Sequence, residues 1–409
     1  MSINIANINH FFKQCGSYRS NKASHITGSI ARTLLALTFL FSGFVKSVDP
    51  LGTVYKVEDY LTAMGLGGLV SIAGTLAVLL IVAEWILGWM MLFNVQTKWT
   101  SWGALLFMLI MTPLTLWIAI TGAVHDCGCF GDALVLTNWQ TFWKNVVLLS
   151  LVLILLYCKK GIPQLFSWWA ELGIVMIGLG ITAGIMGYSY THLPIIDFRP
   201  YKVGNNILEL TSDPETVSIV KHTMTKDGIY KEFSNEEYMA AKNDGWEWYS
   251  QTTEMFIKAN NKLVPIKSEE DLVAKIEDFK LYPFAESLIS SDDLEDDEND
   301  DRKSSFTEEF LSKEKVTMIC MCDLYKANKK QAARAVDLYN SIISKGEECY
   351  FITNSTEADI LSFAETNEID IWAFITLDEK PLETVIRANP GVVVLQNGVV
   401  KEKHNMRQL

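Results

Sequence analysis

The chain has 409 residues, and its charge is divided unevenly: residues 1–195 carry 10 basic and 7 acidic side chains, whereas residues 196–409 carry 25 and 41. This length gives room for two or three domains, and the two halves differ in kind, one apolar and the other acidic. Neither half offers the basic surface that nucleic-acid binding requires, so we expect no nucleic-acid partner.

Five segments of the first half are apolar over the roughly 20 residues that cross a bilayer. They lie near Ile30–Val45, Leu66–Phe93, Trp102–Val124, Trp139–Tyr157 and Leu165–Tyr190. No small-residue cleavage site follows the first segment, so we expect a retained helix, after which Ser42–Lys46 runs on into a loop. The sequence therefore predicts a multi-pass protein in a lipid bilayer, with residues 1–26 as an N-terminal arm.

Basic residues in the short connections predict the orientation. Lysine or arginine occurs in the N-terminal arm, in residues 94–101 and at the end of the fourth segment, but not in residues 125–138. We therefore predict a cytoplasmic N-terminus. Residues 125–138 and everything after about Thr191 then lie on the outer side of the membrane.

The most informative motif, Asp126-Cys127-Gly128-Cys129-Phe130-Gly131-Asp132, lies between the third and fourth apolar segments. Two cysteines one residue apart can close a disulfide, and Gly128 lets the backbone take the dihedrals of so small a ring. Strained, exposed disulfides are often the labile or catalytic ones. We predict Cys127 and Cys129 as a redox pair that accepts electrons from a partner thiol. The alternative is a structural staple that stays oxidised.

The carboxylates that flank this motif, Asp126 and Asp132, disfavour a thiolate on the loop. A closed disulfide that is attacked by the thiolate of another protein avoids this difficulty. His125 stands beside the pair and could shuttle a proton. His125 and the two sulfurs fall within five residues, too close together for a good metal site, so no metal is predicted.

Glu84 lies inside the second apolar segment, where a carboxylate is costly and often functional. We predict that it takes part in a proton path or contacts a quinone. The alternative is a protonated glutamate that is hydrogen-bonded to a neighbouring helix.

The second half begins with a mixed region, residues 192–310. Strands are predicted at Lys221–Phe233 and Trp246–Ile257 and a helix at Glu269–Phe279, followed by an acidic linker at residues 292–301. Residues 311–409 then alternate strand and helix, as in an α/β domain. We expect strands at Lys315–Cys322, Glu348–Thr353 and Trp372–Leu377, helices at Lys326–Lys345 and Ser355–Thr366, and a type I′ hairpin at Asn397-Gly398.

The membrane half resembles the DoxX-like superfamily and, within it, the MauE family, through Ser42–Pro50, Glu84–Gly88 and Cys127–Gly131. The resemblance implies a four-helix membrane bundle of residues 27–160, to which residues 161–191 add a fifth helix. It also implies a bacterial inner-membrane protein whose outer parts lie in the periplasm. The chemistry that it implies is thiol redox chemistry coupled to a membrane quinone, with a periplasmic protein dithiol as partner. Two alternatives are a non-enzymatic membrane scaffold and a subunit of a quinone-linked oxidoreductase.

Residues 311–409 look like a thioredoxin-fold domain, because Asn389-Pro390 precedes a valine-rich strand and a glycine hairpin. The Cys-x-x-Cys of that fold is missing, and only Cys320-Met321-Cys322 lies nearby. Residues i and i+2 of a strand lie about 6.5–7 Å apart, near or past the reach of a disulfide. We predict that these thiols are buried packing residues and that the domain binds a partner. The whole arrangement is similar to multi-domain DoxX proteins of Bacteroidetes.

Overall fold

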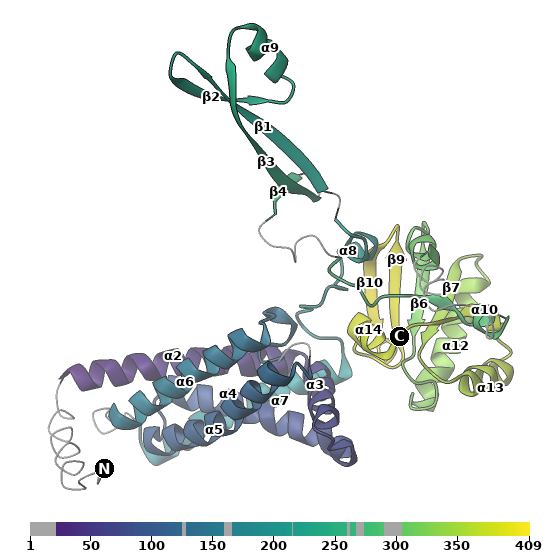
Figure 1. The fold of residues 1–409 in the computed structure, drawn as a ribbon. Coiled ribbons are helices and arrows are strands. Elements are labelled where there is room, and N and C mark those ends of the chain that lie inside the picture. Colours follow the sequence, from purple (N-terminus) through teal and green to yellow (C-terminus); the bar gives the residue numbers. More distant parts are fainter. Residues whose placement is uncertain are drawn as a thin grey trace. The chain divides into compact units, whose positions relative to one another are not determined.

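Figure 1 shows a computed structural model of the chain, which divides between Arg199 and Pro200 into two compact units. The structure describes residues 22–124, 128–158, 166–214, 216–259, 262–266, 274–289 and 305–409. The predicted acidic linker, most of the N-terminal arm, His125 and Cys127 lie outside these residues.

Five helices of the N-terminal unit, within its described residues, are long and apolar enough to cross a membrane. They are α2 (Lys22–Val48), α4 (Ala73–Leu92), α5 (Thr97–Thr121), α6 (Asn138–Cys158) and α7 (Trp168–Thr191). The shorter α3 (Pro50–Ala63) and η1 (Gly67–Ile72) stand between α2 and α4, and η2 (Gly131–Ala133) precedes α6. The five predicted spans are confirmed, and the protein is a multi-pass membrane protein.

Helix α2 continues to Val48, so the expectation that Ser42–Lys46 leads into a loop is wrong. Ser42 and Lys46 are four residues apart and therefore share one face of the helix. The next helix begins at once, because the side chain of Asp49 accepts a hydrogen bond from the backbone N–H of Gly52 at 3.0 Å and Pro50 occupies the first helical position.

Helices α2 and α4 approach each other closely because two glycines have no side chain. A Cβ on Gly43 would lie 2.8 Å from the backbone nitrogen of Trp85, and a Cβ on Gly88 would lie 2.7 Å from that of Leu40. Small residues at such crossings let transmembrane helices pack backbone to backbone. The short separation brings polar side chains of α2 within reach of α4.

Helix α7 packs on α4 through two indole groups. Trp85 Nε1 donates to the carbonyl oxygen of Gly178 at 3.0 Å, and Trp89 Nε1 donates to that of Ile174 at 2.9 Å. The two rings are stacked with centroids 6.0 Å apart. The fifth span therefore belongs to the same helical unit as the other four.

A four-stranded antiparallel sheet opens the C-terminal unit, in the order β2-β1-β3-β4 (Figure 1). Its strands are β1 (Thr216–Lys226), β2 (Ile229–Ser234), β3 (Glu247–Ala259) and β4 (Lys262–Pro265), with the short helices α8 (Ile207–Thr211) and α9 (Tyr238–Asn243) nearby in the sequence. The predicted single strand Lys221–Phe233 is wrong. Asp227 and Gly228 have φ of 53° and 79° and reverse the chain, as Asp-Gly does in type I′ turns.

The predicted helix Glu269–Phe279 is not formed by its described residues, 274–279. Two of their backbone N–H groups bond to an earlier segment instead. Ala274 donates to the carboxylate of Asp213 at 3.2 Å, and Ile276 donates to the carbonyl of Leu210 at 3.0 Å. These N–H groups are thus satisfied by tertiary contacts rather than by a helical turn.

The larger sheet has six strands in the order β10-β9-β6-β7-β8-β5, and β6, β7 and β8 run parallel. Its elements are β5 (Tyr282–Pro283), α10 (Phe284–Ile289), β6 (Val316–Cys320), α12 (Lys329–Ile343), β7 (Glu348–Thr353), α13 (Glu357–Asn367), η5 (Ile371–Ala373), β8 (Phe374–Thr376), α14 (Glu379–Val385), β9 (Gly391–Gln396) and β10 (Val399–Asn405). Phe351 and Phe374 stack in the core, where α12 and α13 also bury their apolar faces. The predicted α/β alternation is confirmed.

The last hairpin also agrees with its prediction. Asn397 and Gly398 have φ of 47° and 76°, the positive values that a type I′ turn requires at both central residues. The Asn389–Pro390 bond, just before β9, is cis.

Candidate functional site

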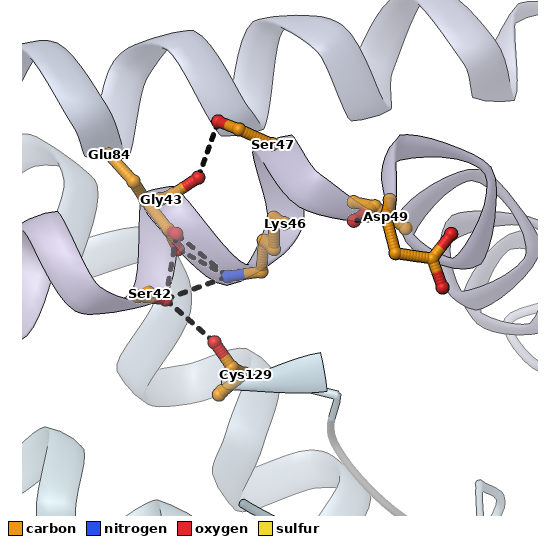
Figure 2. A network of polar contacts seen from close by, with 8 residues as sticks. Ser42, Gly43, Lys46, Ser47, Asp49, Glu84 and Cys129 are labelled. Carbon is orange, nitrogen blue, oxygen red and sulfur yellow. Dashed lines mark hydrogen bonds and ion pairs between the residues drawn. The ribbon is translucent and has the colours of Figure 1, made fainter. Parts of the chain in front are cut away.

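A buried ion pair joins the first two membrane-spanning helices (Figure 2). The ammonium nitrogen of Lys46 on α2 lies 2.7 and 2.8 Å from the two carboxylate oxygens of Glu84 on α4. Their side chains are only 6% and 8% exposed. Desolvating two charges is expensive, and ionisable side chains within spans are usually paired and functional. Glu84 is therefore half of a pair rather than an isolated carboxyl group.

Ser42 connects this ion pair to the cysteine loop. Its hydroxyl oxygen lies 3.0 Å from the Lys46 ammonium, 2.8 Å from a carboxylate oxygen of Glu84 and 2.6 Å from the carbonyl oxygen of Cys129 (Figure 2). A hydroxyl has one proton to donate. Ser42 therefore accepts from Lys46 and donates either to Glu84 or to the backbone of Cys129.

The loop takes its shape from two glycines and an aromatic anchor. Gly128 and Gly131 have φ of 60° and 51°, and the N–H of Gly131 donates to the carbonyl of Gly128 at 3.0 Å. Both φ values lie in the left-handed region, which glycine enters at little steric cost. Phe130 is buried, with its ring 5.3 Å from that of Phe41 and the Lys144 ammonium 4.3 Å from its centroid.

Two of the four predicted site residues, Cys129 and Glu84, meet at one place. Cys127 and His125 lie outside the described residues, so their roles stay predictions. Sequence reasoning missed Ser42 and Lys46 as site residues. The signal was present, because a lysine near the end of one apolar span and a glutamate inside the next must find partners within the membrane.

The residues that form this site come from three segments of one helical region. Residues 24–158 match the family model of the methylamine utilisation protein MauE. The match runs from α2 to α6, about a third of the chain, and confirms the MauE-like part of the predicted resemblance. Neither a curated protein nor a solved structure matches the chain. The relation to the wider DoxX-like superfamily and the thioredoxin-like fold of residues 311–409 stay predictions.

The cysteines of the α/β unit lie in surroundings that suppress the thiolate. Cys320 and Cys349 are buried on β6 and β7, and Cys322 is half-buried just after β6. Burial raises the pKa of Cys320 far above its usual value and that of Cys349 to about 12. Burial and the nearby carboxylate of Glu383 raise the pKa of Cys322 to about 12. Inert thiols of this kind agree with the predicted packing role.

We expect Cys349 to react with iodoacetamide at pH 8 about a thousandfold more slowly in the folded protein than in denaturant. The thiolate is the nucleophile, and a pKa near 12 leaves very little of it at that pH. Peptide mass spectrometry after timed alkylation measures the rate, and the unfolded protein is the control. Equal rates in the two states would contradict a buried, protonated thiol.

Proposed function

We propose that the protein is a membrane thiol–disulfide electron-transfer protein of the methylamine-utilisation type that works through Cys127 and Cys129. The observation that carries this proposal is the meeting of three separate segments at one point. Ser42 and Lys46 of α2, Glu84 of α4 and the backbone of Cys129 form one hydrogen-bonded group. Burying an ion pair within membrane spans costs desolvation free energy, and ionisable side chains at such positions are usually functional. We therefore expect this ion pair, which is hydrogen-bonded to the cysteine loop, to take part in chemistry.

The proposed reaction has two balanced halves. A thiolate of a partner protein attacks the Cys127–Cys129 disulfide and forms a mixed disulfide, which the partner's second thiol resolves. The partner leaves with a new disulfide, and Cys127 and Cys129 hold its two electrons and two protons as thiols. This dithiol then passes both electrons and both protons to a membrane quinone and closes its disulfide again.

The residues near Cys129 supply the kinds of group that a quinone would contact. Phe41 and Phe130 provide aromatic surface beside the loop. The Lys46 ammonium and the Ser42 hydroxyl lie next to it, with their protons engaged by Glu84, by each other and by the Cys129 carbonyl. When bound, a quinone supplies the capacity to accept two electrons. The Lys46–Glu84 pair is the proposed proton relay, because its ammonium and carboxylate are in direct contact and Ser42 bonds the pair to the loop. His125 is a further candidate for this task.

Lysine and arginine in the predicted inner connections support a bacterial inner-membrane protein with the cysteine loop and the C-terminal unit in the periplasm. We assign recruitment of the dithiol partner to the thioredoxin-like residues 311–409. Raised pKa values keep the cysteines of this region, Cys320 and Cys322, protonated and unreactive.

The test is the redox state of the loop cysteines in intact cells. Thiol trapping with a mass-shift reagent should find the pair oxidised in normal cells and reduced in cells that are depleted of quinone. Depletion should then add the mass of two reagent molecules, because both thiols become available together.

The matched control is the Cys127→Ser/Cys129→Ser variant. It keeps every other cysteine but lacks the proposed redox pair, so its labelling should not change on quinone depletion. A wild-type pair that stays oxidised under both conditions would contradict the proposal. That result would favour a structural staple and a scaffold role for the protein.

A further inference from the structure

Lysines from three helices approach the described part of the cysteine loop. Lys46 of α2 contacts it through Ser42, and Lys144 of α6 lies over the ring of Phe130. The third, Lys56, comes from α3, the short helix outside the spans. None of the sequence motifs had singled out Lys56.

The side chain of Lys56 lies directly against Gly128, the residue between the two cysteines. Its Cγ, Cδ and Cε atoms are 3.0, 3.3 and 3.6 Å from the point that a Cβ on Gly128 would occupy. A C–N bond is about 1.5 Å long, so the ammonium nitrogen lies within about 5 Å of that point. The Cα of Cys129 is only about 3.8 Å from that of Gly128. The stem of Lys56 thus contacts the residue that precedes Cys129, and its ammonium group stays near the described part of the loop.

The position of Lys56 follows from the local sequence. Asp49 caps α3 and Pro50 starts it immediately after α2, which fixes the helix close to the end of that span. Lys56 follows the buried Thr53 by three residues and therefore shares the inward face of α3. The absence of a side chain on Gly128 leaves the space into which the lysine stem fits.

We propose that Lys56 stabilises the thiolate of Cys129 and so sets the reactivity of the reduced loop, an inference that rests on the proposed thiol chemistry. The flanking carboxylates alone would oppose a thiolate. An ammonium group near Cys129 favours a negative sulfur, both when that sulfur leaves during reduction and when it attacks to close the disulfide again. Lys56 acts by its charge and forms no bond to the reactants.

Other charged groups share these surroundings, and any pH profile of the loop includes their effects. Around the described residues of the loop, the packed elements carry Lys46, Asp49, Lys56, Glu58, Asp59, Glu84, Asp132 and Lys144. The Lys46 and Glu84 charges offset each other within the ion pair. Lys56 is singled out because its stem touches the residue that joins the two cysteines.

The experiment measures iodoacetamide alkylation of Cys129 against pH in the reduced full-length protein, resolved by peptide mass spectrometry. Lys56→Met keeps the apolar stem that covers Gly128 and removes the charge, whereas Lys56→Arg keeps the charge. We expect Lys56→Met to move the midpoint of the profile up by about one pH unit and to slow alkylation at pH 7 about tenfold. Lys56→Arg should follow the wild type.

Lys98→Met is the matched control, since Lys98 lies at the start of α5, which has 25 residues and places this lysine about 35 Å from the loop. It should leave the profile unchanged. A wild-type profile for Lys56→Met would overturn the inference, as would an equal shift in the Lys98 variant. Thiol trapping in cells is a separate readout, so a loop that never cycles would overturn the proposed function while the alkylation profile still reports on Lys56.

Discussion

Replacing Lys46 by methionine is expected to destabilise the helical unit by about 3–5 kcal/mol, the usual cost of breaking a buried ion pair from one side. Methionine fills similar apolar space but leaves the carboxylate of Glu84 buried without its cation. Ser42 also loses the donor that orients it toward Cys129. The midpoint of unfolding in detergent, followed by tryptophan fluorescence, measures the loss.

The double variant Lys46→Met/Glu84→Met provides the control. Exchanging a whole buried ion pair for apolar residues of similar volume is often neutral or stabilising, so most of the lost stability should return. Cycling of the cysteine loop should not return, because the double variant lacks the ion pair that we propose as the proton relay. A Lys46→Met protein as stable as the wild type would show that the ion pair contributes nothing to the fold.

Gly88→Ala is expected to cost about 1–3 kcal/mol of stability, although alanine normally favours a helix. The added methyl would lie 2.7 Å from the backbone nitrogen of Leu40 and 3.1 Å from the carbonyl oxygen of Ala36, so α2 and α4 must move apart. Their separation would also stretch the contact between Lys46 and Glu84. The same detergent unfolding experiment measures the effect.

Gly74→Ala is the matched comparison on the same helix, since a Cβ there meets nothing within 4 Å. We expect it to be neutral or to stabilise α4 by up to about 1 kcal/mol, because alanine costs less backbone entropy than glycine. Similar losses in both variants would mean that glycine flexibility matters rather than the close crossing of α2 and α4.

The elements that sequence reasoning placed well are those whose signal is local. Long apolar runs gave the five spans, and the positive φ demanded by Asn397-Gly398 gave the last hairpin. The same turn chemistry at Asp227-Gly228 was overlooked within an alternating run, which merged two strands into one. Residues 274–279 have helical spacing, but their N–H groups bond to Leu210 and Asp213. Such tertiary contacts cannot be predicted from the spacing of apolar residues along the sequence.

Only half of the candidate site could be predicted from the sequence, because the site also depends on contacts between distant segments. Cys129 and Glu84 stand out by residue type, one in a paired motif and the other as a carboxylate inside a span. Their meeting depends on Gly43 and Gly88, which determine how closely α2 and α4 cross. Lys46 was read as part of a loop because the apolar run ends before it, whereas the helix continues to Val48.

The indole bonds of Trp85 and Trp89 define the smallest part of the chain that can be prepared as an intact membrane domain. A protein cut after Cys158, where the family match ends, would keep both indoles and lose the carbonyls of Gly178 and Ile174 that they bond. Each indole N–H left without a partner in hydrocarbon costs about 1–3 kcal/mol. Trp85 adjoins Glu84 in the sequence, so this damage would fall next to the ion pair. The membrane domain of this protein is therefore one helix larger than its family match, and it extends to about Arg199.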